Sequence, residues 1–176
     1  HYSLKDVGTR YIGLAQHLQG NDRIKPTDGV QSLSDGITLF SGGSGSEFFS
    51  PANLRILKSE NGKLVCDDFC HEQSLIIQEN GCNMLLAGCA HSGILNIIAK
   101  AEAIIGEPVT HVVAGMHLAG VTDHSFIEGL ANALKAKNCT YYTCHCTGSE
   151  AYEQMKAIMC SQISYIATGD TIRIGN

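Results

Sequence analysis

The sequence contains no apolar run of the roughly 18 residues that a helix needs to cross a bilayer. It also shows no secretory signal peptide, because the chain opens with His1-Tyr2-Ser3-Leu4-Lys5. We therefore expect a cytoplasmic protein that has no membrane partner. The chain does not begin with methionine, which suggests a processed product or a fragment of a longer protein.

Strong charge of one sign is missing as well. The formal net charge is -5, and no long run of like charges occurs. A protein that binds nucleic acid or an anionic membrane surface usually carries a basic patch or stripe. The sequence shows no such patch, so we expect no nucleic-acid partner.

Eight cysteines are present, but none of them forms the Cys-x-x-Cys pair that is typical of structural zinc sites. The spacings Cys66–Cys70 and Cys144–Cys146 do not match that pair. A disulfide framework requires an extracellular context, which no targeting segment supports. Several cysteines lie in apolar, strand-like runs, where a thiol behaves as a small hydrophobic group. We expect most of them to be reduced and structural.

A length of 176 residues and a hydrophobic content of 44% fit one globular domain, which we place at 1–176. In the first half, turn signals such as Ser34-Asp35-Gly36, Asn61-Gly62 and Asn80-Gly81 separate short strand-like runs. The second half alternates between helices and strands. Helices are expected at about 93–105, 123–136 and 149–159, and strands at 110–114 and 140–143. This order predicts an α/β (α+β) protein in which a sheet packs under helices.

The sequence also predicts the conformation of the two termini and of one glycine-rich segment. A short amphipathic helix is expected from about Val7 to Leu18, and two final strands are expected around Tyr165 and Ile172. Segment 41–46, Ser-Gly-Gly-Ser-Gly-Ser, has glycines that could cradle a phosphate. However, it lacks the Lys-Ser/Thr of a P-loop and opens no obvious helix, so we interpret it as a plain loop.

Three short apolar runs each end in a histidine, namely His91, His117 and His145. In α/β proteins, sites are built where the carboxyl ends of sheet strands meet. Neutral imidazole is a good ligand for zinc or iron, and a catalytic metal usually has about three protein ligands and one open position. The pattern therefore predicts a metal site whose bound water becomes the nucleophile near neutral pH.

The remaining histidines lack this context. A single histidine usually finds an ordinary hydrogen-bond partner, which is our interpretation of His17, His111 and His124. His71 is intermediate, because it precedes an expected strand and lies beside acids that could reach a metal or a substrate. We take His71 and Glu72 as candidates for residues close to the substrate.

The order of these segments resembles one branch of the metallo-β-lactamase superfamily. Gly88 to Asn96 is similar to its GCSHxGIxN segment, Gly115 to Leu118 to its GGxHL segment, and Cys144 to Gly148 to its HCTG segment. The stretch Asp68 to Leu75 resembles its D-x-F-x-H-E-x-x-L lead-in. This branch includes proteins similar to the synthase that joins a dihydropterin to ribofuranosylaminobenzene phosphate. The match extends from about Ile24 to the C-terminus.

The resemblance implies an αββα sandwich with a metal-binding edge and usually two zinc, iron or manganese ions. His91 would take the place of the family's third-motif histidine ligand, and His145 the place of its last one. His117 lies near the usual position of a bridging acid. Asp123 is the nearest downstream acid, but a helix cap explains it better. The expected cofactor is therefore a divalent metal, with zinc first and iron or manganese as alternatives.

The chain departs from the family in one large respect. The leading H-x-H-x-D-H motif, which supplies most of the metal ligands, is absent, and His1 to Leu4 echo it only faintly. The family's N-terminal β-rich half is not found either, so the expected sandwich is incomplete on that side. We interpret the chain as the C-terminal portion of a longer enzyme or as a divergent copy. The remaining ligands alone would bind metal weakly.

Three functions stay open. The first is a metal-dependent hydrolase in which a metal-bound hydroxide attacks an ester or phosphoester-type bond of a small-molecule substrate. The second is a catalytically inactive remnant that serves as a binding or oligomerisation module, since an exposed apolar sheet face would favour a homo-oligomer. The third is a redox or thiolate–metal protein that uses Cys144 and Cys146 beside His145. The sequence selects no substrate, because loops determine the substrate in this fold.

Overall fold

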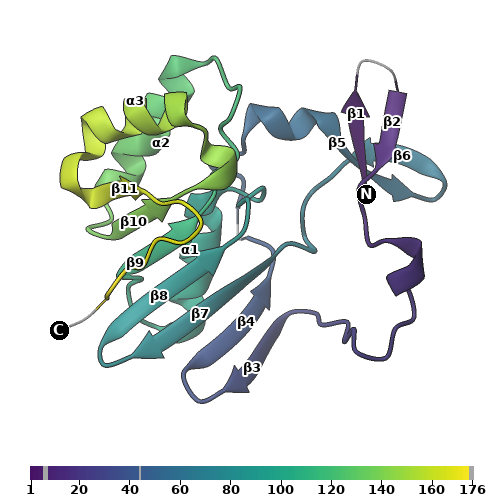
Figure 1. Ribbon diagram of the computed structural model, residues 1–176, viewed down its shortest axis with the longest axis horizontal. Coiled ribbons are helices and arrows are strands. Elements are labelled where there is room, and N and C mark those ends of the chain that lie inside the picture. The colour runs from purple at the N-terminus through teal and green to yellow at the C-terminus, as the bar shows by residue number, and fades with distance from the viewer. Residues whose placement is uncertain (6–7, 44, 175–176) are drawn as a thin grey trace.

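A computed structural model describes residues 1–5, 8–43 and 45–174, without the side chains of Leu4 and Lys5 (Figure 1). Two sheets organise the chain. The larger has seven strands in the order β11-β10-β9-β8-β7-β4-β3, and the smaller has four in the order β2-β1-β5-β6. In Figure 1 the small sheet lies to the side of the larger sheet and its helices. The molecule therefore has a helix-covered body and a smaller β-unit beside it.

The small sheet contains two antiparallel hairpins. Its strands are β1 (Tyr2–Lys5), β2 (Gly8–Tyr11), β5 (Ile56–Glu60) and β6 (Lys63–Cys66). Asn61 and Gly62 connect β5 to β6 with φ of 51° and 76°. Positive φ at both positions is what a tight two-residue hairpin turn requires, so the hairpin expected from Asn-Gly is confirmed.

The helix expected from Val7 to Leu18 is wrong. Gly8–Tyr11 forms β2, and only Gln16–Leu18 forms a single 3-10 turn, η1, while Val7 lies outside the described residues. Pairing with β1 satisfies the β2 backbone, and the rings of Tyr2 and Tyr11 meet edge to face at 5.5 Å. A cross-strand aromatic pair stabilises a hairpin, which here prevails over a weak helical pattern.

The large sheet combines an antiparallel and a parallel part. The antiparallel strands are β3 (Val30–Ser34), β4 (Ile37–Ser41), β7 (Gln73–Glu79) and β8 (Cys82–Ala87). The parallel part runs from β8 through β9 (His111–Ala114) and β10 (Thr140–Thr143) to β11 (Ile163–Tyr165). The connecting helices are α1 (Ile94–Ile105), α2 (His124–Lys135) and α3 (Ser149–Met159). Three further 3-10 turns are η2 (Pro51–Arg55), η3 (His145–Thr147) and η4 (Cys160–Gln162).

One hydrophobic core lies between the large sheet and its three helices. Ile76, Leu85, Val112 and Tyr141 are fully buried on the helix-covered face of the strands. The α1 stripe Ile94, Ile97, Ile98 and Ala101 packs against them. The mixed fold, with a sheet packed under helices, is therefore confirmed. Among the described residues, no helix is both long and apolar enough to cross a membrane.

The second of the two expected final strands is wrong. Around Tyr165 the chain forms β11, but the described residues that follow, up to Ile174, contain no strand. Ile172 and Ile174 instead line a cavity with Met84 and Val113. The final apolar side chains therefore cover part of the sheet surface and do not extend its edge.

Replacing Asp123 with alanine is expected to lower Tm by about 2–4 °C. The Asp123 carboxylate caps α2 by accepting hydrogen bonds from the Phe126 amide (3.1 Å) and the Ser125 hydroxyl (2.6 Å), which confirms the helix cap expected from the sequence. The Asp123→Asn variant keeps an acceptor and should lose less. The measurement is a thermal melt followed by circular dichroism.

The same cap predicts a pH dependence. The Ser125 and Phe126 donors lower the pKa of Asp123. The cap therefore stabilises the folded protein fully above the pKa of about 3.9 that an aspartate has in the unfolded chain. This stabilisation is lost as the pH falls through the lower pKa that Asp123 has in the folded protein. The Tm difference between wild type and Asp123→Ala should shrink in acid, and a difference that stays constant below that range would contradict the capping role.

Candidate metal centre

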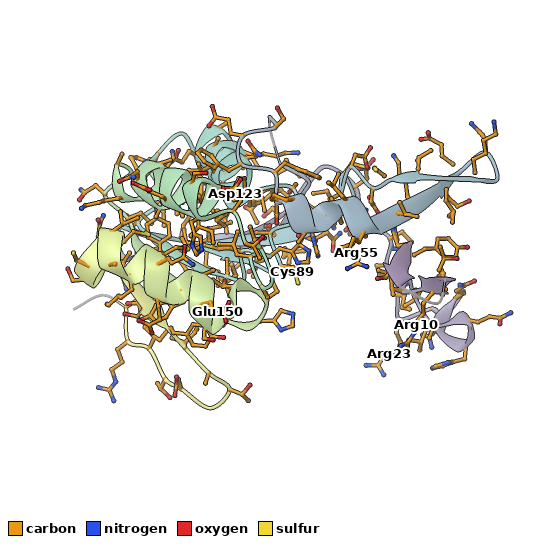
Figure 2. All side chains as sticks on the ribbon, turned by 90° about the horizontal axis from the view of Figure 1, so that it is seen from above. Arg10, Arg23, Arg55, Cys89, Asp123 and Glu150 are labelled. Atoms are coloured by element: carbon orange, nitrogen blue, oxygen red, sulfur yellow. The ribbon has the colours of Figure 1, made fainter. Side chains whose placement is uncertain are left out.

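The three predicted histidines meet at one edge of the large sheet. Strands β8, β9 and β10 are neighbours and run parallel, so their carboxyl ends share that edge. His91, His117 and His145 follow these three strands in turn. The ring centroids of His91 and His117 are 4.1 Å apart, and the Cys89 thiol interacts with both His91 and His145. Figure 2 shows Cys89 where the helix-covered body meets the part that carries Arg55 and Arg10.

The backbone around these histidines is strained in the same way in all three loops. Ala90, His117 and His145 have φ of 53°, 46° and 51°. Positive φ is uncommon for residues other than glycine, and such residues cluster at functional sites. The Leu118 and Ala119 amides both donate to the Cys146 carbonyl at 2.9 Å, which holds the second and third loops together.

Glycine is required at position 115 because the chain passes very close to a thiol. A Cβ on Gly115 would lie 2.7 Å from the Cys146 Sγ and 3.1 Å from the Gly88 carbonyl. The Gly115 amide also donates to that carbonyl at 2.8 Å, which joins the loops after β8 and β9. The three loops therefore form one connected unit.

Two thiols belong to this unit. Cys89, Cys146 and His145 each offer a ligand atom, and these atoms all lie within 4.8 Å of one another. A hydrogen bond between the two thiols lowers the pKa of Cys89 and raises the pKa of Cys146, and His91 lowers the pKa of Cys89 further. Thiolate and imidazole together are a donor set that zinc accepts.

Cys89 was not predicted as a ligand, although it lies in the same short segment as His91. The sequence instead suggested a thiol pair of Cys144 and Cys146. Within the described part of the chain, Cys144 is not in the donor cluster, and burial raises its pKa. Only the tertiary fold brings Cys89 next to Cys146.

Asn53 orients the His91 imidazole. Its side chain is buried in η2, its Nδ2 donates to the His91 carbonyl at 2.7 Å, and its Oδ1 lies 2.9 Å from the His91 Nδ1. This orientation of the amide assigns the imidazole proton to Nδ1 and leaves the lone pair on Nε2 for a ligand. Phe69 stacks on the imidazole, with ring centroids 4.5 Å apart and an interplanar angle of 9°. No sequence pattern pointed to Asn53.

His117 is held and kept neutral by its surroundings. The Ser50 hydroxyl donates to the His117 carbonyl at 2.6 Å, and the His117 amide donates to the Cys146 Sγ at 3.3 Å. Burial lowers the pKa of His117, and the neighbouring His91 lowers it further. A neutral imidazole is the form that binds metal.

The candidates Glu72 and His71 are adjacent in sequence but lie in different surroundings. Glu72 accepts from the His91 amide at 2.7 Å and from the Ser92 amide and hydroxyl at 2.9 and 2.8 Å. Its carboxylate therefore holds the loop that leads into α1. His71 is exposed, and its Nδ1 lies 3.7 Å from a carboxylate oxygen of Asp67. Proximity of either residue to a substrate stays a prediction.

His17, His111 and His124 lie outside this cluster and have ordinary environments. His111 Nδ1 contacts the Thr110 hydroxyl at 2.9 Å, and His124 Nδ1 contacts the Gln154 side-chain oxygen at 2.7 Å. His17 is exposed in η1.

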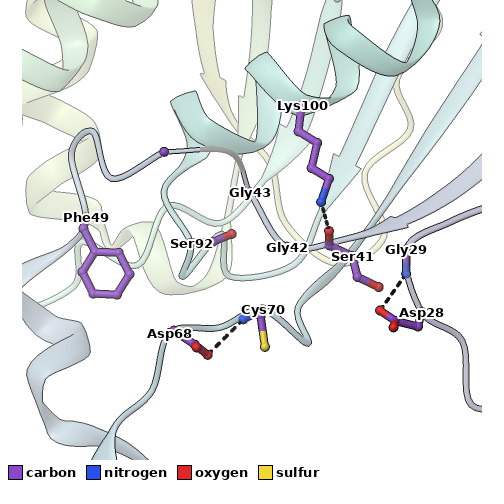
Figure 3. Close-up of a pocket in the computed structure, with 11 residues that line it drawn as sticks. Asp28, Gly29, Ser41, Gly42, Gly43, Phe49, Asp68, Cys70, Ser92 and Lys100 are labelled. Atoms are coloured by element: carbon purple, nitrogen blue, oxygen red, sulfur yellow. Dashed lines mark hydrogen bonds between the residues drawn. The ribbon is translucent and has the colours of Figure 1, made fainter.

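A polar pocket of about 260 Å³ lies beside the His91 loop (Figure 3). Ser41 ends β4, and the other described residues of segment 41–46 form a loop in which Gly42, Gly43 and Gly45 line the pocket, while Ser44 lies outside the described residues. Lys100 of α1 reaches into the lining and donates to the Ser41 carbonyl at 2.5 Å. Further lining residues are Asp28, Gly29, Phe49, Asp68, Cys70 and Ser92.

No family model matches the chain, whereas curated proteins and solved structures similar to it were found. An uncharacterized protein of Methanocaldococcus jannaschii is 27% identical over 99 residues, which cover 56% of this chain and 36% of the relative. The 7,8-dihydropterin-6-methyl-4-(β-D-ribofuranosyl)-aminobenzene-5′-phosphate synthase of the same organism is 30% identical over 106 residues, which cover 59% of this chain and 36% of the relative. The chain thus matches about a third of the length of these relatives.

Among solved structures, the chain is similar to a metal-dependent hydrolase of the β-lactamase superfamily. The TM-score is 0.71 at 21% identity, and the match covers 86% of this chain and 58% of that chain. At this identity the likeness concerns the fold.

Proposed function

We propose that this chain, which has the metallo-β-lactamase fold, forms part of the metal centre of a hydrolase that acts on an ester or phosphoester of a small molecule. The observation that carries the proposal is the convergence of His91, His117 and His145 on Cys89 at the ends of three neighbouring parallel strands. Sites in α/β proteins are built at such an edge.

The donors at this edge fit a divalent metal. His91 and His117 offer imidazole nitrogens, while Cys89, Cys146 and His145 form a compact sulfur and nitrogen cluster. Nitrogen and sulfur donors favour zinc or iron over manganese, and zinc is our first choice. When bound, the metal would supply a Lewis acid that activates water for hydrolysis.

The surrounding residues support the same proposal through positioning. Asn53 and Phe69 fix the His91 ring, and Glu72 fixes the loop that carries it. Such outer partners set ligand orientation and are part of a working metal site. His145 is exposed, which gives a substrate access to this edge.

The pocket beside Ser92 supports a small polar substrate. Among the described lining residues Lys100 is the one cation, and Asp68 is paired with Lys58 at 2.7 Å. A lysine and glycine amides can receive an acidic group such as a phosphate. One curated relative is named as the synthase of a 5′-phosphate compound, which makes phosphoesters the first substrates to screen.

Elemental analysis of the purified chain by plasma mass spectrometry tests the proposal. We expect zinc, iron or manganese in at least a near-stoichiometric amount, and about one equivalent less of it in the His91→Ala, His145→Ala double variant, because two ligands of this centre are removed. His124→Ala is the matched control and should keep its metal. Any phosphoester hydrolysis should fall in parallel with the metal. A wild-type chain without metal would contradict the proposal.

A binding or oligomerisation module is a second candidate, and the outer face of the large sheet favours it. Ile172 and Ile174 cover part of this face and line a cavity of about 510 Å³ with Ile77, Met84 and Val113. The edge strand β3 exposes Val30 and Leu33 by 54% and 53%. Apolar surface of this kind is typical of contacts between copies. Light scattering should then give a dimer or larger species, and a monomer with metal and turnover would reject this candidate.

A further inference from the structure

A second group of metal-type donors lies outside the centre described above. His1, Asp67 and His71 each offer one ligand atom, and these atoms all lie within 4.8 Å of one another. We propose that these three side chains bind a divalent transition metal such as Zn²⁺ at the junction of the two sheets. His1 directly precedes β1, Asp67 directly follows β6, and His71 lies two positions before β7.

The carboxylate of Asp67 is the anchor of this group. Its side chain has 0% exposure, and a buried charge requires partners. The Phe69 amide donates to Oδ1 at 2.9 Å. Among the described residues, two imidazoles also contact this carboxylate, with His1 Nδ1 at 2.5 Å from Oδ2 and His71 Nδ1 at 3.7 Å from Oδ1. A cation that both imidazoles and the carboxylate share would neutralise this buried charge.

The two imidazoles favour a metal over two protons. Their rings stack with centroids 3.8 Å apart at an interplanar angle of 30°. Two imidazolium cations at this separation would repel each other, whereas two imidazoles that share one metal ion place a single cation between them and the carboxylate. A neutral imidazole beside a buried carboxylate is a donor pair that zinc uses.

The spacing of the donors is close to that of a tetrahedral ion. Zinc ligands lie about 2.1 Å from the metal and therefore about 3.4 Å from one another. The His71 to Asp67 separation of 3.7 Å is already near this value, whereas the 2.5 Å between His1 and Asp67 must open by about 1 Å. The side chains of His1 and His71 are 35% and 47% exposed, which leaves room for water ligands and an access path.

Phe69 separates this group from the first centre. Its buried ring stacks on His91 at 4.5 Å and lies 6.2 Å from the His71 ring. The two sets of donors share no residue. Because His1 and Asp67 adjoin the small sheet and His71 adjoins the large one, a bound ion would fasten one sheet to the other and stabilise the fold.

Titration of the metal-free chain with Zn²⁺, in competition with a chromophoric chelator, tests this inference. We expect His71→Ala to bind one Zn²⁺ fewer than wild type, while the control His124→Ala binds as many as wild type. His71 is suited to this test because its side chain is half exposed and its removal opens no core cavity. Unchanged stoichiometry and affinity in His71→Ala would overturn the proposal.

The double variant His91→Ala, His145→Ala separates this inference from the proposed function. If Zn²⁺ raises the Tm of the double variant, and no longer does so once His71→Ala is added, the second site is supported whatever the first centre binds. If Zn²⁺ raises the Tm equally with and without His71→Ala, or does not raise the Tm of the double variant, the second site is rejected. A wild-type chain that loses all its Zn²⁺ through His71→Ala alone would support the second site and contradict the first.

Discussion

The Asn53→Ala variant is expected to bind metal at the His91 centre about 10–100-fold more weakly than wild type. Alanine removes both the acceptor that holds the His91 Nδ1 and the donor to the His91 carbonyl. The imidazole can then turn, and its other nitrogen no longer has a fixed tautomer. The affinity is measured by chelator competition in chains that also carry His71→Ala, so that the second group of donors does not contribute.

Asn53→Asp is the matched control for this effect. A carboxylate keeps an acceptor for the His91 Nδ1 proton but loses the donor to the carbonyl. We expect it to keep most of the affinity, as a histidine ligand often donates to a carboxylate. Equal affinities in wild type and Asn53→Ala would mean that stacking on Phe69 alone orients the His91 ring.

The Glu72→Ala variant is expected to lower the free energy of unfolding by about 3 kcal/mol. The carboxylate accepts three hydrogen bonds from His91 and Ser92, and alanine leaves all three donors without their partner. An unsatisfied buried donor costs about 1–3 kcal/mol, and water can reach part of this half-buried site, so the total is less than three full penalties. Urea denaturation followed by circular dichroism gives the value.

Glu128→Ala is the control for the change in charge. Glu128 is exposed on α2, and alanine is a good helix former, so the change in stability should stay within about 0.5 kcal/mol. If Glu72→Ala differed from this control by less than about 1 kcal/mol, the Glu72 contacts would not be what holds the His91 loop.

Local chemistry explains why much of the fold was predictable. Asn61-Gly62 adopts the positive φ values of a tight turn, and the apolar stripe of α1 and the Asp123 cap of α2 follow from spacing and hydrogen bonding within a few residues. The two errors, the helix from Val7 and the strand at Ile172, fall in segments whose conformation depends on distant partners. Pairing with β1 determines the first, and the surface of the large sheet determines the second.

The same distinction applies to the candidate metal centre. The meeting of the three histidines at one edge was predictable because each follows a recognisable strand, and neighbouring parallel strands share an edge. Asn53 and Cys89 were missed as site residues because only tertiary contacts reveal their roles. Asn53 lies 38 positions before the His91 that it orients, and the Cys146 thiol approaches Cys89 across 57 positions.

The register of the large sheet and the geometry of the metal centre depend on each other. His117 meets His91 only when β9 pairs with β8 as Leu86 opposite Val113, and it meets the Cys146 loop only when Ala114 lies opposite Thr143. A slip by one residue would turn every side chain of β9 to the opposite face and break up the donor set. An ion held by the proposed donor set would therefore stabilise only the native pairing, and it would select against misregistered sheets during folding.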